Sequence, residues 1–200
     1  AVRLWQDTVE KWPANGRAWN NLGLALSGAR RYPEALAVCL ETVKIDPLLA
    51  ETHNNLGNAY YNLGRIEESL PHYRKAIELN PRDTASHYNR GLACMKAHSF
   101  QEAIHDFGKV IALHPDHVRA HVNRGEAFRK IGAYDQAMRD FDTAIKLEPE
   151  NAAAYRERGN LYADLGDPRR AARDLEASER KKAYEERTHH HGTDQIEWGN

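Results

Sequence analysis

The chain has 200 residues, of which 41% are hydrophobic and 28% charged, a composition that suits a folded core rather than a disordered tract. Its 28 Lys and Arg residues nearly balance 29 Asp and Glu residues, so bulk charge gives no basis for binding to nucleic acid or to a membrane surface. No apolar run approaches the roughly 20 residues that a membrane-spanning helix requires.

Residues 1–13 predict a single amphipathic helix that Pro13 ends, with Val2, Trp5 and Val9 on one face. Trp5 and Cys39 occupy equivalent positions of a two-helix unit that repeats through the chain, so the segment corresponds to the second helix of that unit. We therefore expect residues 1–13 to be a truncated repeat and the sequence to be a piece of a longer protein.

One constant period runs through the rest of the chain. Five glycines keep this interval from Gly23 to Gly159, and five prolines keep it from Pro13 to Pro149. A shared period of about 34 residues predicts an array of one repeated supersecondary unit. Five units are expected within residues 14–182, at about 16–49, 50–83, 84–117, 118–151 and 152–182.

The second unit shows the internal plan of a repeat. Its apolar spacing predicts a helix from Thr52 to Leu63, a left-handed stop at Gly64, and a second helix from about Glu67 to Leu79. Gly57 lies within the first helix, where glycine costs about 1 kcal/mol relative to alanine. We therefore expect the second helix to pack too closely there for a side chain. The small residues predicted to match the repeat glycines are Ala35, Ser69, Ala103, Ala137 and Ala171.

After the fifth unit, Glu176–Arg187 is almost all charged and suits a solvated capping helix. Residues 183–200 should therefore hold the end of that helix and a C-terminal tail. The tail is either flexible or docked on a groove through Ile196 and Trp198. His189–His191 would bind nickel or zinc as any such tract can.

The two-helix unit that repeats through the chain resembles the tetratricopeptide repeat, whose pattern is W-x2-L-G-x2-Y…A-x3-F…P. The residues that carry the resemblance are Trp19, Leu22, Gly23, Leu26, Ala35, Cys39 and Pro47; His53, Leu56, Gly57, Tyr60, Ser69, Tyr73 and Pro81; His87, Arg90, Gly91, Cys94, Ala103, Phe107 and Pro115; His121, Arg124, Gly125, Phe128, Ala137, Phe141 and Pro149; and Tyr155, Arg158, Gly159, Tyr162, Ala171 and Leu175. Arg replaces Leu before the glycine in the last three units, and His replaces Trp in the middle three. We expect neither change to matter much for the fold.

The resemblance implies an all-α fold, a right-handed α-solenoid of stacked antiparallel helix pairs whose first helices line a concave face. Residues 4–23 also resemble the start of the repeat region in some multi-span membrane proteins that carry a glycosyltransferase-like domain.

An asparagine stands two residues before the repeat glycine in four units, at Asn21, Asn55, Asn89 and Asn123. An amide donates and accepts together, so it can bind the backbone of an extended peptide without reading its side chains. The row resembles the asparagine ladder of O-linked N-acetylglucosamine transferase. The alternative is that these amides only tie neighbouring helices together.

Other side chains expected on the concave face suggest a peptide partner that carries acidic residues and an apolar anchor. The alternative is an ordinary solvated helix face. The same family uses a carboxylate clamp of five roles, of which only three are kept here. The further candidate binding residues are Asn54, Asn58, Tyr88, Arg119, Arg129 and Arg156.

No residue pattern indicates catalysis, a metal site or a cofactor: G-x-S-x-G, a phosphate-binding glycine loop and H-E-x-x-H do not occur. His53, His87 and His121 stand one repeat apart, so they should occupy packing positions rather than converge on one ion.

The sequence therefore predicts a non-enzymatic scaffold that binds a peptide or partner protein on its concave face, with no direct membrane contact. Two alternatives stay open. One is an acceptor-presenting domain of a larger membrane-bound enzyme, and the other is self-assembly of a homo-oligomer through the terminal helices. Localisation is left between the cytoplasm and an extracytoplasmic site.

Overall fold

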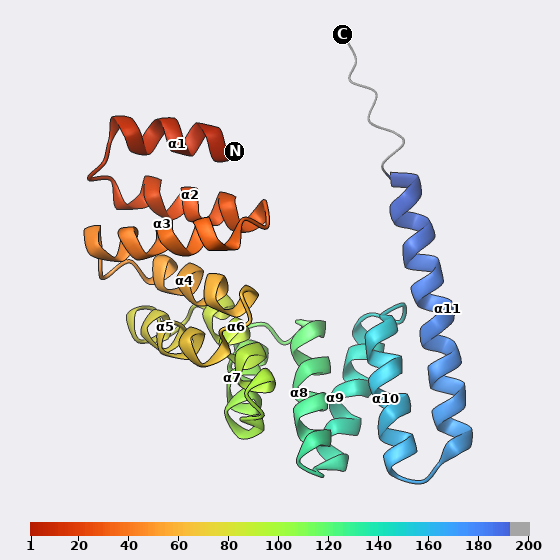
Figure 1. Ribbon diagram of the computed structural model, residues 1–200. Coiled ribbons are helices and arrows are strands. Elements are labelled where there is room, and N and C mark those ends of the chain that lie inside the picture. Colours follow the sequence, from red (N-terminus) through yellow and green to blue (C-terminus); the bar gives the residue numbers. More distant parts are fainter. Residues whose placement is uncertain (193–200) are drawn as a thin grey trace. The chain divides into compact units, whose positions relative to one another are not determined.

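The computed structural model describes the backbone of residues 1–192 and the side chains of residues 1–183. Ile196 and Trp198 lie outside the described residues, and so do the side chains of His189–His191. Eleven helices and no strand occur in the described chain (Figure 1). They are α1 (Val2–Lys11), α2 (Gly16–Gly28), α3 (Tyr32–Ile45), α4 (Ala50–Asn62), α5 (Ile66–Leu79), α6 (Thr84–Lys96), α7 (Phe100–Leu113), α8 (Val118–Lys130), α9 (Tyr134–Leu147), α10 (Ala152–Asp164) and α11 (Pro168–Gly192).

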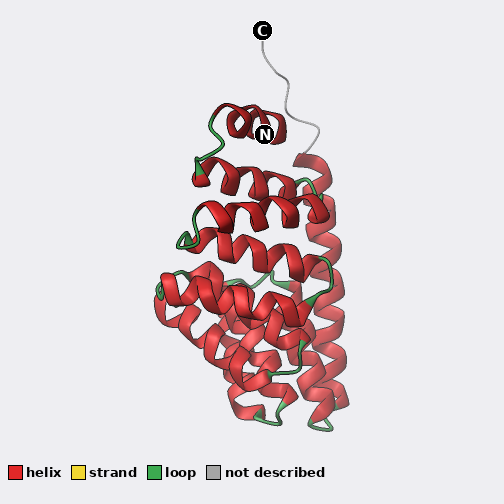
Figure 2. Cartoon of the chain, turned by 60° about the vertical axis from the view of Figure 1, so that its left-hand side comes forward, coloured by secondary structure: helices red, strands yellow, loops and turns green. Residues whose placement is uncertain are grey.

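The helices form antiparallel hairpins (Figure 2). The chain divides into two compact units between Leu113 and His114. The first helix of each hairpin, here called an A helix, is α2, α4 or α6 in the first unit and α8 or α10 in the second. Its partner, the B helix, follows it along the chain. Within each unit, successive A helices pack against each other, whereas successive B helices of the same unit do not do so in the described chain. Each unit is therefore tighter on its A side, which forms its inner surface.

The repeat glycines mark the closest approach inside each hairpin. A Cβ atom built on Gly57 would lie 2.6 Å from the ring of Tyr73, and one on Gly91 would lie 2.7 Å from the ring of Phe107. The expected steric reason for the glycines is thus confirmed, with one refinement. The obstruction at these two glycines is the aromatic ring four residues after the small residue of the B helix, while Ser69 and Ala103 are themselves fully buried.

The turn inside each hairpin contains one residue with positive φ, at the equivalent position of every repeat. Gly64, Gly132 and Gly166 have φ between 75° and 77°, which confirms the left-handed stop predicted at Gly64. Arg30 and His98 take the same place with φ of 58°. A residue with a side chain in this left-handed region costs about 1–2 kcal/mol relative to glycine. The first and third hairpins therefore each carry backbone strain that the others avoid.

The ring at the first pattern position fastens each of the first four A helices to the turn before it. The indole N–H of Trp19 donates to the carbonyl oxygen of Pro13 over 2.9 Å. His53, His87 and His121 place Nε2 3.0–3.1 Å from the carbonyl oxygen of the proline six residues earlier. Histidine can therefore replace tryptophan here because both rings offer an N–H at the same place.

The two ends of the described chain differ in character. Val9 of α1 is buried, and Val2 and Trp5 pack against the same apolar cluster, as the sequence predicted. At the other end, the last B helix and the expected capping helix are one continuous helix of 25 residues, α11. None of the helices described has both the length and the apolar character to cross a bilayer.

Candidate functional site

The asparagines of the first unit form hydrogen-bonded pairs between neighbouring A helices. Asn55 of α4 donates from Nδ2 to Oδ1 of Asn20 of α2 over 2.9 Å. Asn89 of α6 donates in the same way to Asn54 of α4 over 3.0 Å. The two bonds join residues of consecutive repeats, so the ladder ties these repeats together and fixes the orientation of its amides.

Each pair leaves hydrogen-bonding capacity on the inner surface. An asparagine amide has two donors and an acceptor oxygen with two lone pairs, and each bond uses one donor of one partner and one lone pair of the other. Asn54 and Asn89 are half-buried, whereas only 7% of Asn55 is exposed, so Asn55 acts mainly within the ladder. Asn21 is half-buried, and its side chain forms no hydrogen bond with the described residues.

Two other predicted peptide-binding residues of the first unit, Asn58 and Tyr88, contact rings inside their hairpins. Asn58 accepts a hydrogen bond of 2.8 Å from the hydroxyl of Tyr73, the ring that fills the space beside Gly57. Tyr88 meets the ring of Phe107 edge to face, with centroids 5.7 Å apart. Burial raises the pKa of the nearby Tyr61, and Tyr88 adds to this effect.

In the second unit, Arg156 and Glu157 of α10 stand at the repeat positions of Asn54 and Asn55, while Asn123 of α8 keeps the amide. Arg129 of α8 reaches α10, with Nη1 2.7 Å from Asp164 and Nη2 3.6 Å from Glu157. Arg156 pairs with Glu157 over 3.0 Å. Burial, together with the nearby Glu157, raises the pKa of Glu126.

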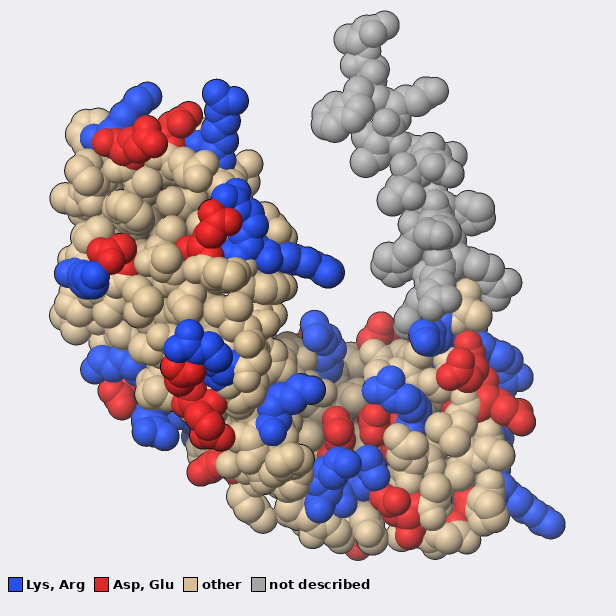
Figure 3. Space-filling model, in the orientation of Figure 1, with Lys and Arg blue, Asp and Glu red and all other residues tan. Residues whose placement is uncertain are grey.

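Two arginines that the sequence predicted to bind a partner, Arg129 and Arg156, are thus already paired with acidic side chains of the same unit. The side chain of Arg129 is 14% exposed and that of Arg156 is 59% exposed, so Arg156 has more freedom to meet a ligand. Arg119 is exposed and Asn123 half-buried on the same A helix. Figure 3 shows acidic and basic side chains interspersed over the visible face of this unit.

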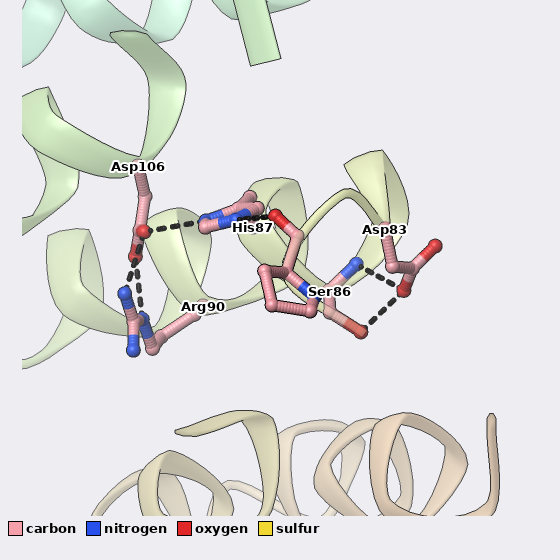
Figure 4. Close-up of polar contacts among 6 residues, drawn as sticks. Asp83, Ser86, His87, Arg90 and Asp106 are labelled. Atoms are coloured by element: carbon pink, nitrogen blue, oxygen red, sulfur yellow. Dashed lines mark hydrogen bonds and ion pairs between the residues drawn. The ribbon is translucent and has the colours of Figure 1, made fainter. Parts of the chain in front are cut away.

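A buried ion-pair cluster lies inside the third hairpin (Figure 4). Arg90 binds Asp106 with two hydrogen bonds of 2.7 Å, and Nδ1 of His87 lies 3.0 Å from the same carboxylate. Asp106 is fully buried. Burial would raise the pKa of its carboxyl group, but the hydrogen bonds from Arg90 and His87 outweigh burial and hold that pKa below its usual value.

The fourth hairpin repeats this cluster with His121, Arg124 and Asp140. Two bonds of 2.8 and 2.7 Å join Arg124 to Asp140, and Nδ1 of His121 lies 3.1 Å from the carboxylate. The other ring nitrogen faces the carbonyl oxygen of Pro115, so a doubly protonated ring satisfies both acceptors. The hydrogen bond to Asp140 accordingly raises the pKa of His121.

The fifth hairpin keeps the arginine and the aspartate but not the histidine. Arg158 binds Asp174 over 2.6 and 3.0 Å and also reaches Asp142 of α9 over 2.7 Å. The signal for all three clusters was present in the sequence, where an aspartate follows each pattern arginine at one fixed spacing. The tetratricopeptide pattern defines each position separately, so it shows each arginine as a departure from leucine and does not indicate its aspartate partner.

The described side chains contain no group of three His, Cys, Asp or Glu residues arranged to hold a metal ion. Cys39 and Cys94 are free and buried, and burial raises the pKa of their thiols to about 12 and about 11. Both thiols are therefore protonated and unreactive at neutral pH.

Stacked antiparallel hairpins that repeat with a constant period define an α-solenoid. Two family models described as "Tetratricopeptide repeat" match residues 1–50 and residues 50–83 and 84–117, and one described as "TPR repeat" matches residues 125–166. The chain therefore belongs to the tetratricopeptide repeat family, and the fold predicted from the sequence is confirmed. Proteins of this family are typically non-enzymatic scaffolds for protein–protein interaction.

Solved structures of the same fold include YrrB, described as a TPR protein with an unusual peptide-binding site. It matches with a TM-score of 0.77 and 19% identity over 92% of this chain and 94% of its own. MamA residues 41 to the end, from Desulfovibrio magneticus RS-1, match with a TM-score of 0.78 and 20% identity over 84% and 96%. Another MamA structure gives 0.74 and 22% over 83% and 97%. No curated protein matches the chain by sequence.

Proposed function

We propose that the first unit binds an extended segment of a partner protein along its A helices, through hydrogen bonds to the backbone of that segment. The amide pairs Asn20–Asn55 and Asn54–Asn89 carry this proposal, because they hold the ladder in one orientation before a ligand arrives. The peptide-binding site named for YrrB supports the same use of the fold. Asn21, Asn54 and Asn89 offer the free donors and acceptors.

The test uses peptides selected from a random displayed library on the immobilised protein. The Asn21→Ala and Asn89→Ala double variant should bind a selected peptide at least fivefold more weakly in calorimetry, since each lost hydrogen bond is worth about 1 kcal/mol. N-methylation of the peptide backbone should weaken binding to the unaltered protein as well.

The matched control is Asn62→Ala, which removes an exposed amide of α4 that bonds only to the carbonyl of Asn58 in its own helix. Thermal unfolding should show that each variant keeps its fold. Equal affinity for the double variant and the control would mean that the ladder is structural only.

For the second unit, we propose that Arg119, Asn123 and Arg156 select partner segments with acidic residues. Arg156 is the clearest candidate, since its side chain is more than half exposed even though it pairs with Glu157. Arg156→Gln should weaken binding of an acidic peptide in low salt, and much less so in high salt, where the charges are screened. An unchanged affinity in low salt would exclude this role.

Self-assembly is a second candidate function, because α1 and the residue that follows it expose 64% of Leu4 and 65% of Trp12. Replacing both with aspartate should convert any oligomer to monomer in sedimentation velocity. A monomer before and after the change would rule it out. Presentation of acceptor proteins to a membrane-bound enzyme stays a hypothesis based on residues 4–23.

A further inference from the structure

A cleft of about 500 Å³ lies between α10 and α11 in the last hairpin. Five basic side chains line it, and the lining contains a single carboxylate, that of Asp174. The basic residues are Arg158, Arg170, Arg173, Arg180 and Lys181. A cleft with so many cations has a positive potential that its low-dielectric walls strengthen.

Two tyrosine rings hold three of these cations in place. The ring of Tyr155 lies 5.5 Å from the guanidinium of Arg158 and 4.9 Å from the ammonium of Lys181. The ring of Tyr162 lies 6.0 Å from Arg158 and 5.6 Å from Arg170. A ring face attracts a cation without neutralising it, so these contacts order the side chains and leave their charge available.

The carboxylates around the cleft leave two of the five cations unpaired. Asp174 is bound by Arg158 inside the cleft, over 2.6 and 3.0 Å. Outside the lining, Asp142, Asp167 and Glu150 pair with Arg158, Arg170 and Lys181. Arg173 and Arg180 form no ion pair with any side chain that the structure describes.

The unpaired arginines lie on the same stripe of α11. They are two helical turns apart, and Ala177 lies between them on the stripe. The short alanine side chain leaves space over which both long guanidinium groups can converge. An anion in that space would receive forked N–H donors from both sides, the geometry in which arginine binds phosphate and carboxylate most strongly.

The corresponding cleft of the third hairpin provides an internal comparison. It has a volume of about 300 Å³ and is lined by Arg90 and Cys94 of α6 and by Glu102 and His105 of α7, together with Leu70 and Arg74 of α5 and Ser99. Two repeats later in the sequence, Arg170 and Arg173 occupy the places of Glu102 and His105. The cleft of the third hairpin holds two arginines and one glutamate, so the excess of five basic side chains over one carboxylate is specific to the last hairpin of these two.

We propose that the cleft between α10 and α11 binds a phosphate dianion, carried either by a small molecule or by a phosphorylated side chain, with Arg173 and Arg180 as its main partners. The volume exceeds that of one phosphate group, which leaves space for the group that bears it. The site uses the face of α10 that carries Tyr155, Arg158 and Tyr162. It is thus separate from the surface of Arg156 and Glu157, and each proposal can fail without the other.

The test is calorimetry on the full chain with two probes, inorganic pyrophosphate and a phosphoserine peptide paired with its unphosphorylated form. We expect binding of at least one phosphate probe. Arg173→Gln with Arg180→Gln should weaken that binding at least tenfold. Ala177→Leu keeps every charge but fills the space, and it should weaken binding similarly while far-UV circular dichroism stays unchanged.

The matched control is Arg169→Gln with Lys182→Gln, which removes the same charge from exposed positions of α11 outside the cleft. Equal losses in the control and the test variant would reduce the effect to general electrostatic attraction and overturn the proposal. Absence of binding for both phosphate probes would also overturn it. Tighter binding of the phosphopeptide than of pyrophosphate would identify a phosphorylated protein as the source of the anion, and the reverse would identify a small molecule.

Discussion

The hairpins α4–α5 and α8–α9 pack in the same way, but the polar side chains in their interiors differ. Both place a histidine ring 3.0 Å from the carbonyl oxygen of a proline, and both press an aromatic ring against the repeat glycine. In α8–α9 the other ring nitrogen of His121 meets Asp140. In α4–α5 the residue corresponding to Asp140 is His72, and Nδ1 of His53 is buried without a hydrogen bond among the described residues.

The two hairpins also differ at one further position, which holds Leu56 in α4 and Arg124 in α8. Leu56 is buried apolar surface, whereas Arg124 neutralises the carboxylate that His121 also approaches. The two solutions show that arginine and aspartate belong together, since either alone would leave a buried charge without a partner. The repeat fixes the shape of the hairpin interior, and the polarity of that interior differs from one hairpin to the next.

Removing Asp140 should have the largest effect. Asp140→Ala leaves Arg124 and His121 facing each other without the carboxylate, and we expect a loss of about 3 kcal/mol in unfolding free energy. His72→Ala should cost only about 1 kcal/mol, because it loses mainly the stacking of His72 on Tyr60. Urea unfolding at pH 7 measures both, with hydrogen exchange to locate the loss. Similar losses in the two hairpins would erase the distinction.

Installing the arginine and the aspartate of α8–α9 in α4–α5 should reveal a coupling free energy of about 2 kcal/mol between the two substitutions. Leu56→Arg alone and His72→Asp alone each introduce a half-buried or buried charge without its partner, so each should destabilise the hairpin. The double variant supplies both charges and gives Nδ1 of His53 an acceptor, and it should recover most of the loss. A double-mutant cycle from urea unfolding measures the coupling. Additive losses would show that the hairpin interior of α4–α5 cannot form the cluster.

Replacing the cluster of α8–α9 with the residues of the first hairpin should lower the unfolding free energy by about 1 kcal/mol at most, or raise it. His121→Trp, Arg124→Leu and Asp140→Val together install the residues that the first hairpin has at Trp19, Leu22 and Val38. The indole can donate to Pro115 as Trp19 does to Pro13. A triple variant as unstable as Asp140→Ala would show that the ion pair itself, rather than the avoidance of an unpaired charge, stabilises α8–α9.

The period of glycines and prolines was enough to predict the hairpins, because each glycine has a steric cause that any repeat of this kind must satisfy. The clusters were not predicted, although Arg124 and Asp140 stand at a spacing that recurs in three hairpins. A family pattern describes one position at a time, whereas an ion pair depends on the residues at two positions together. The pairing of Asn54 with Asn89 was considered as an alternative, but side-chain orientation across two helices does not follow from periodicity.

The smallest expected effect is a pH dependence of opposite sign in the two hairpins. The raised pKa of His121 means that its bond to Asp140 stabilises α8–α9 fully below about pH 6.5, the usual histidine value, and that this contribution is lost as the pH rises through the raised pKa. Burial and the nearby His53 lower the pKa of His72, so α4–α5 is favoured above about pH 6.5 and loses stability as the pH falls through that lowered value.

Hydrogen exchange at pH 8 and at pH 5.5, corrected for intrinsic rates, should therefore show greater protection of α8–α9 and lower protection of α4–α5 at the acidic pH. His121→Gln should abolish the gain in α8–α9 and leave α4–α5 unchanged, and His72→Gln should do the reverse. The two histidines occupy different places in the hairpin, so the sign of each change follows from its neighbours rather than from its position in the repeat. Changes of the same sign in both hairpins would mean that a group shared by all the repeats controls the response to pH.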